Sequence, residues 1–217
     1  MILALDTSTA LASVALYDGA VSAEISWRSG RNHSVELMQQ ATSLMALRKL
    51  TVEQLTAVAV ATGPGSYTGL RVGLACGKGL CLALGLPMIG VNSLDVLAEA
   101  QRESFLPVRS LLDAGRNRFA TALYRRGEHG MERAGPIQGK RLSEALALLF
   151  EPTLLCGDVD QTAVDAAGGH PLARVASPSG SLRRAGFLAE IAWGRLGRGE
   201  AEDPRQVDAI YLTREDP

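Results

Sequence analysis

The 217 residues of the chain suffice for one domain or two small lobes with a hydrophobic core. Hydrophobic residues make up 47% of the sequence and charged residues 21%, which excludes an intrinsically disordered chain, and the net charge of −1 gives no overall signal for nucleic-acid binding. Three cysteines without a CxxC pair exclude a disulfide framework, and we find neither a signal peptide nor an apolar run of about 20 residues, so we expect a soluble cytoplasmic protein.

The first half of the chain predicts a strand meander followed by alternating helices and strands. Apolar runs at 2–6, 12–17 and 21–27, with a turn at Asp18-Gly19, predict three antiparallel strands. Apolar residues at helical spacing predict a helix over 34–49. The other elements predicted in this half are a short helix with a capping box at Thr51 and Gln54, a buried strand over 57–61, a helix over about 71–84, a strand over 87–91, and a helix capped by Ser93.

The second half begins in the same way as the first. In each half an apolar strand ends in an acid, Asp6 or Asp113, and a tyrosine follows 11 positions later, Tyr17 or Tyr124. This offset suggests duplicated lobes, although two amphipathic hairpins could also share it by chance. The other elements predicted here are strands over 108–113 and 119–125, a helix over 143–150, a strand over 153–156, a helix over 161–167, a short strand over 172–175, a helix over 181–195 and an apolar run at 209–212.

These elements together predict an α/β fold with two lobes. We place the N-terminal lobe at residues 1–103 and the C-terminal lobe at 104–204, and we expect the closing segment 205–217 to return to the first lobe.

The turn after the first strand is the first candidate site, Asp6-Thr7-Ser8. Such a turn can bind phosphate through backbone N–H groups and place a carboxylate near a metal ion. It can equally be satisfied by its own side chains. A nucleotide hydrolase should also carry a glycine pair for adenosine late in the chain, and Gly157 and Gly168-Gly169 are poor substitutes. We therefore expect a vestigial phosphate loop without catalysis.

A glycine-rich block is the second candidate. Its later part, Gly73 to Lys78, resembles a Walker A loop only loosely, because the spacer is one residue short and no Ser or Thr follows the lysine. Three of the glycines recur every fourth residue, which gives a helix a smooth face for close packing. The sequence leaves open whether this face packs inside the lobe or across a subunit interface. The glycines that determine the shape of the block are Gly63, Gly65, Gly69, Gly73 and Gly77.

Metal and nucleophilic chemistry find little support in the sequence. His33 stands alone before the first long helix, and Leu37 occupies the position one turn later where a second ligand would be needed. No Ser–His–Asp or Cys–His set can be assembled. Residues 101–141 carry nine Arg or Lys against four acids, an excess that could contact RNA phosphate, although a solvated or partner-facing basic surface is the preferred interpretation. We expect no metal, no cofactor and no catalytic residue.

Several segments resemble the TsaB (YeaZ) family, from one end of the chain to the other. They are the opening ILALDTS, the segment 31–34 (RNHS), the block GPGSYTGLRVG at 63–73, the stretch DAGRNRFATALY at 113–124 and the closing IYLTR at 210–214. The resemblance implies two actin-like lobes (ASKHA, ribonuclease H-like), each a mixed sheet with flanking helices and the second reduced. The sequence departs from the family in its second turn at 113–120 and before the closing segment, where Asp208-Ala209 replaces a proline.

The resemblance also implies a role. TsaB-like proteins are catalytically inert partners of TsaD, which transfers a threonylcarbamoyl group to the adenosine beside the anticodon of ANN-decoding tRNAs. They form homodimers and a heterodimer with TsaD and work with the ATPase TsaE, so contact with tRNA would be indirect. Binding of a nucleotide at a subunit interface is left open.

In TsaB relatives the subunit interface uses two helices, which correspond to 34–48 and 71–84 here. We expect replacement of Leu74 or Met45 by a charged residue to abolish complex formation and leave the protein folded. The interface candidates are His33, Leu37, Met38, Leu44, Met45, Leu70, Arg71, Leu74, Lys78 and Leu82.

The main alternative is an enzyme of the same superfold, either an ATPase or kinase or a glycoprotease-type peptidase acting on a partner. A phosphotransferase needs a second acidic phosphate loop and an adenosine motif, and a metallopeptidase needs paired ligands; we find neither. An independent tRNA-binding module would need a more basic surface than the net charge provides.

Overall fold

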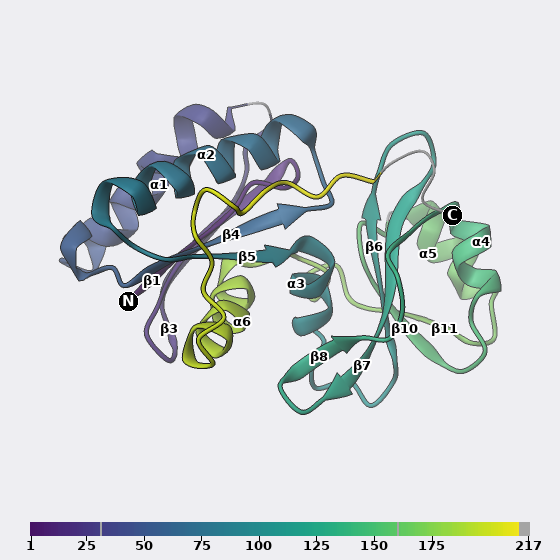
Figure 1. Ribbon diagram of the computed structural model, residues 1–217. Coiled ribbons are helices and arrows are strands. Elements are labelled where there is room, and N and C mark those ends of the chain that lie inside the picture. The colour runs from purple at the N-terminus through teal and green to yellow at the C-terminus, as the bar shows by residue number, and fades with distance from the viewer. Residues whose placement is uncertain (31, 160, 213–217) are drawn as a thin grey trace. The chain divides into compact units, whose positions relative to one another are not determined.

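The computed structural model describes residues 1–30, 32–159 and 161–212. It divides into two compact units, residues 1–93 with 183–210, and residues 94–182 with 211–212. Each unit contains one sheet with parallel and antiparallel strand pairs and helices packed beside it (Figure 1). The predicted α/β fold with two actin-like lobes is confirmed.

The sheet of the first unit has the strand order β3-β2-β1-β4-β5. β1 pairs antiparallel with β2 and parallel with β4, and β4 pairs parallel with β5. Apolar runs and the tight turn after Tyr17 account for the predicted meander, which the structure confirms. The strands are β1 (Ile2–Asp6), β2 (Leu11–Tyr17), β3 (Val21–Arg28), β4 (Ala57–Gly63) and β5 (Met88–Asn92).

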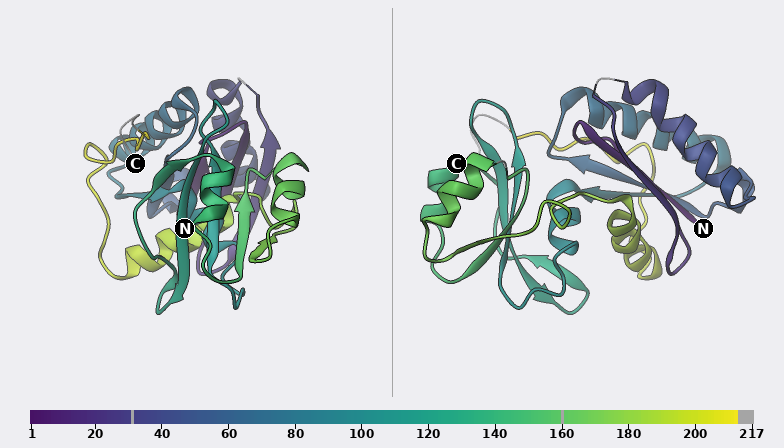
Figure 2. Two further views of the ribbon diagram at one scale, coloured as in Figure 1. Left: turned by 90° about the vertical axis from the view of Figure 1, so that its right-hand side faces the viewer. Right: turned by 180° about the vertical axis from the view of Figure 1, so that it is seen from behind.

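Three helices cover this sheet. α1 (His33–Leu47) and α2 (Tyr67–Leu84) lie on one face, and α6 (Ala185–Gly197) lies on the other (Figures 1 and 2). A short 3-10 turn, η1 (Val52–Gln54), begins where predicted, with the Gln54 side chain accepting a hydrogen bond from the Thr51 amide. α2 begins four residues earlier than predicted, because Ser66 caps it by accepting a hydrogen bond from the Gly69 amide.

The boundary between the units differs from the predicted division at residue 103. The helix predicted over 181–195 packs on the first sheet, where α6 crosses β1 and β2, and it is not part of the second unit. The segment after α6 stays with the first unit: Val207 is buried in its core, and the Ile210 amide donates to the Thr62 carbonyl. Tyr211 and Leu212 are counted with the second unit, so this part of the predicted return to the first lobe is wrong, and 213–217 lie outside the described residues.

The second unit repeats the strand order of the first. Written from the corresponding edge, its sheet runs β8-β7-β6-β10-β11, with β9 also paired to β7. β6 pairs antiparallel with β7 and parallel with β10, as β1 does with β2 and β4, which supports duplicated lobes. β8 and β9, which are three or four residues long, were not predicted. The strands are β6 (Val108–Asp113), β7 (Phe119–Gly127), β8 (Gly130–Arg133), β9 (Gln138–Lys140), β10 (Thr153–Gly157) and β11 (Ala173–Val175).

The helices of the second unit are short, and the reduction of this lobe lies in them: its sheet is as large as that of the first unit. They are α3 (Ser93–Glu99), whose first residue is counted with the first unit, α4 (Leu142–Ala147) and α5 (Gln161–Gly168).

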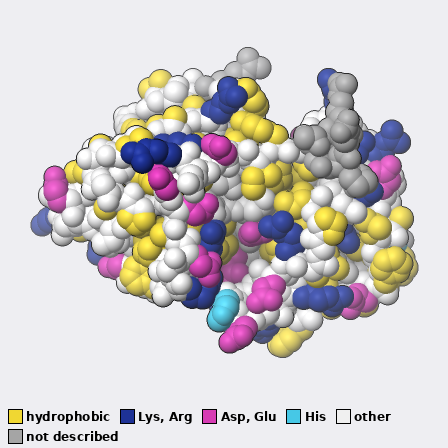
Figure 3. Space-filling model, in the orientation of Figure 1, with side chains coloured by type: hydrophobic (Ala, Val, Ile, Leu, Met, Phe, Trp, Pro, Cys, Tyr) yellow, Lys and Arg dark blue, Asp and Glu magenta, His cyan; other side chains and the backbone are white. Residues whose placement is uncertain are grey.

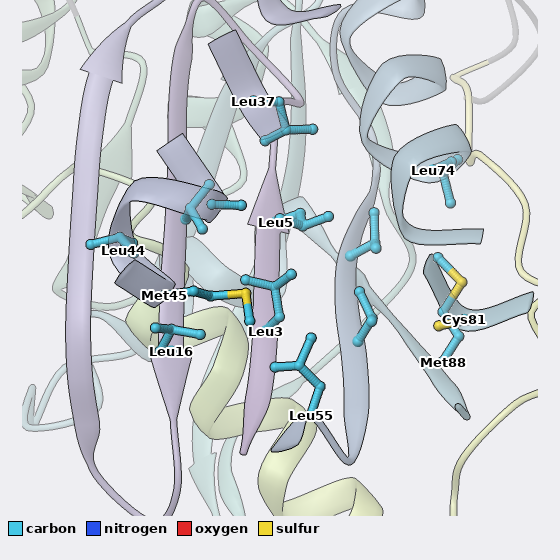
Figure 4. Packing of buried hydrophobic residues seen from close by; sticks show 14 of the residues in the cluster. Leu3, Leu5, Leu16, Leu37, Leu44, Met45, Leu55, Leu74, Cys81 and Met88 are labelled. Carbon is cyan, nitrogen blue, oxygen red and sulfur yellow. The ribbon is translucent and has the colours of Figure 1, made fainter. Parts of the chain in front are cut away.

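Each unit has its own apolar core. In the first, side chains from α1 and α2 point onto the sheet, among them Leu37, Met45 and Leu74 (Figure 4). The cysteines are free thiols, and burial raises the pKa of Cys81 to about 11 and that of Cys156 to about 12. Among the described helices, none combines the length and apolar character needed to cross a bilayer.

Candidate functional site

The Asp6 turn is closed on itself. Asp6 is fully buried at the end of β1, and its Oδ1 accepts hydrogen bonds from the Ser8 amide at 2.8 Å and the Ser8 hydroxyl at 2.6 Å. Thr7 and Ser8 are buried as well. The Ser8 amide, which a phosphate oxygen would need, is thus already bonded to a side chain of the turn. Of the two interpretations of this turn, the structure favours the one in which its own side chains satisfy it.

An arginine neutralises the same carboxylate from the opposite end of the chain. The Oδ2 of Asp6 lies 3.4 Å from the Nε of Arg183, and both side chains are at least 98% buried. The Arg183 guanidinium also donates to the Thr9 hydroxyl. Sequence reasoning missed Arg183, because it lies 177 residues away in a polar stretch before α6 and no motif marks it.

The glycine block fits tightly against this turn. The Ser66 amide donates to the Ser8 carbonyl at 2.6 Å, and the Thr7 hydroxyl donates to the Gly69 carbonyl at 2.7 Å. A methyl group at Gly65 or Gly69 would collide with the carbonyl oxygen of Ser8 or Thr7, respectively.

The other glycines of the block are equally constrained by their neighbours. A methyl group at Gly73 would lie 2.5 Å from the Thr7 hydroxyl, and one at Gly77 would lie 2.6 Å from Val60. Gly63 has a φ of +109°, which disfavours any side chain. The open question is therefore answered: the glycine face packs inside the lobe, onto residues 7–8 and β4.

This packing predicts that alanine substitutions at two glycines of α2 change the stability of the protein in opposite directions. Gly69→Ala is expected to destabilise the protein by about 1–3 kcal/mol, because the methyl group forces α2 away from Thr7. Gly79→Ala is expected to stabilise it by about 0.5–1 kcal/mol, since no atom lies within 4 Å of the new methyl group and alanine favours the helix. Urea denaturation of both variants measures the difference. Equal stabilities would contradict the packing role of Gly69.

His33 begins α1 close to the turn but does not form a metal site. Its side chain is 95% buried, and burial lowers the pKa of His33, while the nearby carboxylates of Glu36 and Asp6 oppose that shift. Leu37, one turn later, is part of the apolar core. Across the described residues, no three His, Cys, Asp or Glu side chains gather where they could hold a metal ion. Arg31, which precedes His33 in the family-like segment, lies outside the described residues.

The corresponding turn of the second unit is a hairpin loop between β6 and β7. Asp113 is exposed, its Oδ1 accepts from the Gly115 amide at 2.8 Å, and its own amide donates to Asp158 Oδ2 at 3.0 Å. Gly115, Arg116 and Asn117 all have positive φ angles. Unlike the first turn, this one is open to solvent.

Many of the predicted interface residues lie in the core. Leu37, Leu44, Met45, Leu70 and Leu74 are at most 7% exposed. All but Leu70 belong to the core cluster drawn in Figure 4, so they hold α1 and α2 onto the sheet. The expectation that a charge at Leu74 or Met45 leaves a folded protein is therefore wrong, because an unpaired charge in an apolar core destabilises the fold. Buried His33 is equally unavailable.

The remaining candidates are at least partly accessible. Arg71 and Leu82 are exposed, Met38 is half-buried, and Lys78 forms an ion pair with Asp208 at 2.9 Å. On α2, the Arg71 guanidinium stacks on the Tyr67 ring at 4.0 Å from its centre.

The exposed residues of α1 and α2 form a surface that we call the outer helix face. Arg71 is its one charged member, because Glu36 and Lys78 are half-buried. In Figure 3 the visible part of the region over α2 is mostly white and yellow, with a few charged side chains among them. The outer helix face comprises Ser34, Val35, Gln39, Thr42, Ser43, Ala46 and Leu47 on α1, and Tyr67, Thr68, Arg71, Ala75, Gly79, Leu82 and Ala83 on α2.

Known proteins resemble the chain over most of its length. The family model described as TsaD, tRNA N6-adenosine threonylcarbamoyltransferase, matches residues 24–177. The Bacillus subtilis tRNA threonylcarbamoyladenosine biosynthesis protein TsaB is 35% identical over 160 residues, which cover 72% of this chain and 70% of that protein. The Escherichia coli protein of the same description is 34% identical over 133 residues, 60% of this chain and 57% of that protein, so this second match spans less than two thirds of the relative.

Solved structures agree with these matches. YeaZ from Pseudomonas aeruginosa superposes with a TM-score of 0.84 at 27% identity, covering 97% of this chain and 99% of that one. A second Pseudomonas aeruginosa structure, described as an uncharacterized protein with similarity to peptidase YEAZ, gives a TM-score of 0.83 at 27% identity and covers 98% and 99%.

Proposed function

The chain belongs to the TsaB (YeaZ) family, and from this premise we propose that it acts in the biosynthesis of threonylcarbamoyladenosine in tRNA as a non-catalytic partner of a TsaD-type subunit. In this role it binds the catalytic subunit and supports threonylcarbamoyl transfer to the adenosine beside the anticodon. A TsaE-type ATPase completes the proposed complex. The outer helix face, which would bind the catalytic subunit, would also pair two copies of the chain when that subunit is absent.

The outer helix face is the observation that carries this proposal. A solvent-facing helix surface normally presents many charged side chains, whereas this one presents Arg71 alone across two helices. Depletion of charge with aromatic and arginine side chains retained is typical of the centre of a protein interface. The small residues Ala75, Gly79 and Ala83 lie on the exposed side of α2 and permit close approach of a partner helix.

The closed Asp6 turn supports the non-catalytic part of the proposal. A phosphate loop needs free backbone amides, and an acid that holds a metal needs free oxygen lone pairs. Here Ser8 donates to one carboxylate oxygen of Asp6, the buried Arg183 cation lies 3.4 Å from the other and disfavours a second cation there, and Gly65 and Gly69 pack directly against the turn.

The peptidase alternative lacks comparable support. The buried thiols of Cys81 and Cys156 have raised pKa values of about 11 and about 12, so neither supplies a thiolate nucleophile at neutral pH. The Ser66 hydroxyl accepts a hydrogen bond from the Gly69 amide as a helix cap.

Reconstitution tests the proposed function. Threonylcarbamoyl transfer to an ANN-decoding tRNA should be measured with purified TsaD-type and TsaE-type subunits of the same organism, with and without this chain. We expect transfer only in the mixture that contains the chain, and no transfer by the chain alone. Equal transfer in its absence would overturn the proposal, and transfer by the chain alone would overturn its non-catalytic part.

A further inference from the structure

The arginines of the second unit differ in whether an acid neutralises them. On β7, Arg125 and Arg126 form ion pairs with Glu151 and Glu103, and on β8 Arg133 pairs with Asp95. These cations lie toward the end of the sheet where β6 begins, since Val108 is paired with Tyr124. Their charges are compensated, so that end offers little net attraction to an anion.

Four cations gather at the opposite end of the sheet, and we call them the basic corner: Arg116, Arg118, Lys140 and Arg141. β7 brings them together with β9, because Phe119 is paired with Lys140 and the Arg118 guanidinium donates to the Gly139 carbonyl. Arg141 immediately precedes α4. The left-handed turn at 115–117 places Arg116 at the exposed tip of the hairpin.

No ion pair neutralises the basic corner within the described part of the chain. One acid, Glu144, lies beside it, and its Oε2 accepts a hydrogen bond from the Arg141 amide at 2.7 Å. This hydrogen bond lowers the pKa of Glu144. The nearby charges of Arg141, Arg118 and Lys140 lower it further, so the three cations lie around one carboxylate.

Among the described residues, two more acids lie at this end of the sheet, but main-chain donors engage them. Asp113 Oδ1 accepts from the Gly115 amide, and Asp158 Oδ2 accepts from the Asp113 amide. Both lie on the β6 and β10 side, whereas the cations lie on the β7 and β9 side. Apart from the Arg118 hydrogen bond to Gly139, the guanidinium and ammonium groups therefore remain available to an external anion.

We propose that the basic corner binds phosphates of the tRNA backbone, so that this subunit contacts the RNA directly. The inference rests on the proposed function, which makes tRNA the polyanion that the complex must hold. Guanidinium groups fit phosphate oxygens in a bidentate manner, and several unpaired cations on one corner match consecutive backbone phosphates. Such contacts are independent of base sequence and sensitive to salt.

Fluorescence anisotropy with a labelled, transcribed ANN-decoding tRNA tests this inference, using the full chain alone and together with the TsaD-type subunit. The test variant is Arg116→Gln/Arg141→Gln, which removes two exposed cations. The matched control is Arg125→Gln/Arg126→Gln, which removes two ion-paired cations from the same unit. Binding is measured at 50 and 200 mM KCl.

Loss of two phosphate contacts should make the fall in affinity between 50 and 200 mM KCl about tenfold smaller. We therefore expect the affinity of the wild-type protein and the control to fall about tenfold more steeply with salt than that of the test variant. Equal affinity and equal salt dependence of test and control variants, or no binding by the wild-type protein in either state, would overturn the inference. If transfer still depends on the chain in those cases, the proposed function stands without the RNA contact.

Discussion

Asp6→Asn is expected to lower the free energy of unfolding by about 3–5 kcal/mol, because it leaves the Arg183 guanidinium buried without its counter-charge. Asparagine keeps the size of the side chain and can still accept a hydrogen bond from Ser8, so the loss reports on charge and not on a cavity. Urea denaturation followed by circular dichroism measures it.

Two comparisons make this result specific. Asp208→Asn breaks an ion pair whose acid is 83% exposed, and it should cost less than about 1 kcal/mol. Combining Asp6→Asn with Arg183→Met should restore most of the lost stability, because a buried pair can be replaced by uncharged groups of similar volume at little cost. A loss below about 1 kcal/mol for Asp6→Asn, or no recovery in the double variant, would contradict the buried ion pair.

Local patterns in the sequence were sufficient to predict most of the elements. Short apolar runs identify the hairpins of both units, and helical spacing identifies α1 and α2, because these signals arise within one segment. The short strands β8 and β9 lack such a signal, since each is three or four residues long and contains glycine.

Contacts between distant segments were beyond prediction. The Asp6–Arg183 pair and the packing of α6 on the first sheet join the two ends of the chain, and nothing in the local sequence indicates them. Which side of α1 and of α2 faces the sheet was also ambiguous. Because the outer helix face is nearly uncharged, the sequence pattern does not separate the two sides of each helix, and Leu74 could not be distinguished by pattern from a partner-facing residue.

Gly79→Glu is expected to abolish binding of the TsaD-type subunit while leaving the chain folded. Gly79 is an exposed residue of the outer helix face, and no atom lies within 4 Å of a Cβ atom built there. Glutamate favours a helix more than glycine does, so the stability of the free chain should not fall. In the complex, however, the new carboxylate would be buried without a partner, which should weaken binding at least about 100-fold.

Gly197→Glu is the matched control, since Gly197 is an exposed helical glycine with equally open surroundings at the end of α6, on the other face of the sheet. It should bind the catalytic subunit with wild-type affinity and support transfer. Leu74→Glu serves as the opposite control: it should fail to fold, because Leu74 is 6% exposed within the apolar core. Circular dichroism, size-exclusion co-elution and threonylcarbamoyl transfer separate the three outcomes. A folded Gly79→Glu protein that still binds at wild-type affinity would remove the outer helix face as the docking surface, and a folded Leu74→Glu protein would contradict the packing of α2 on the sheet.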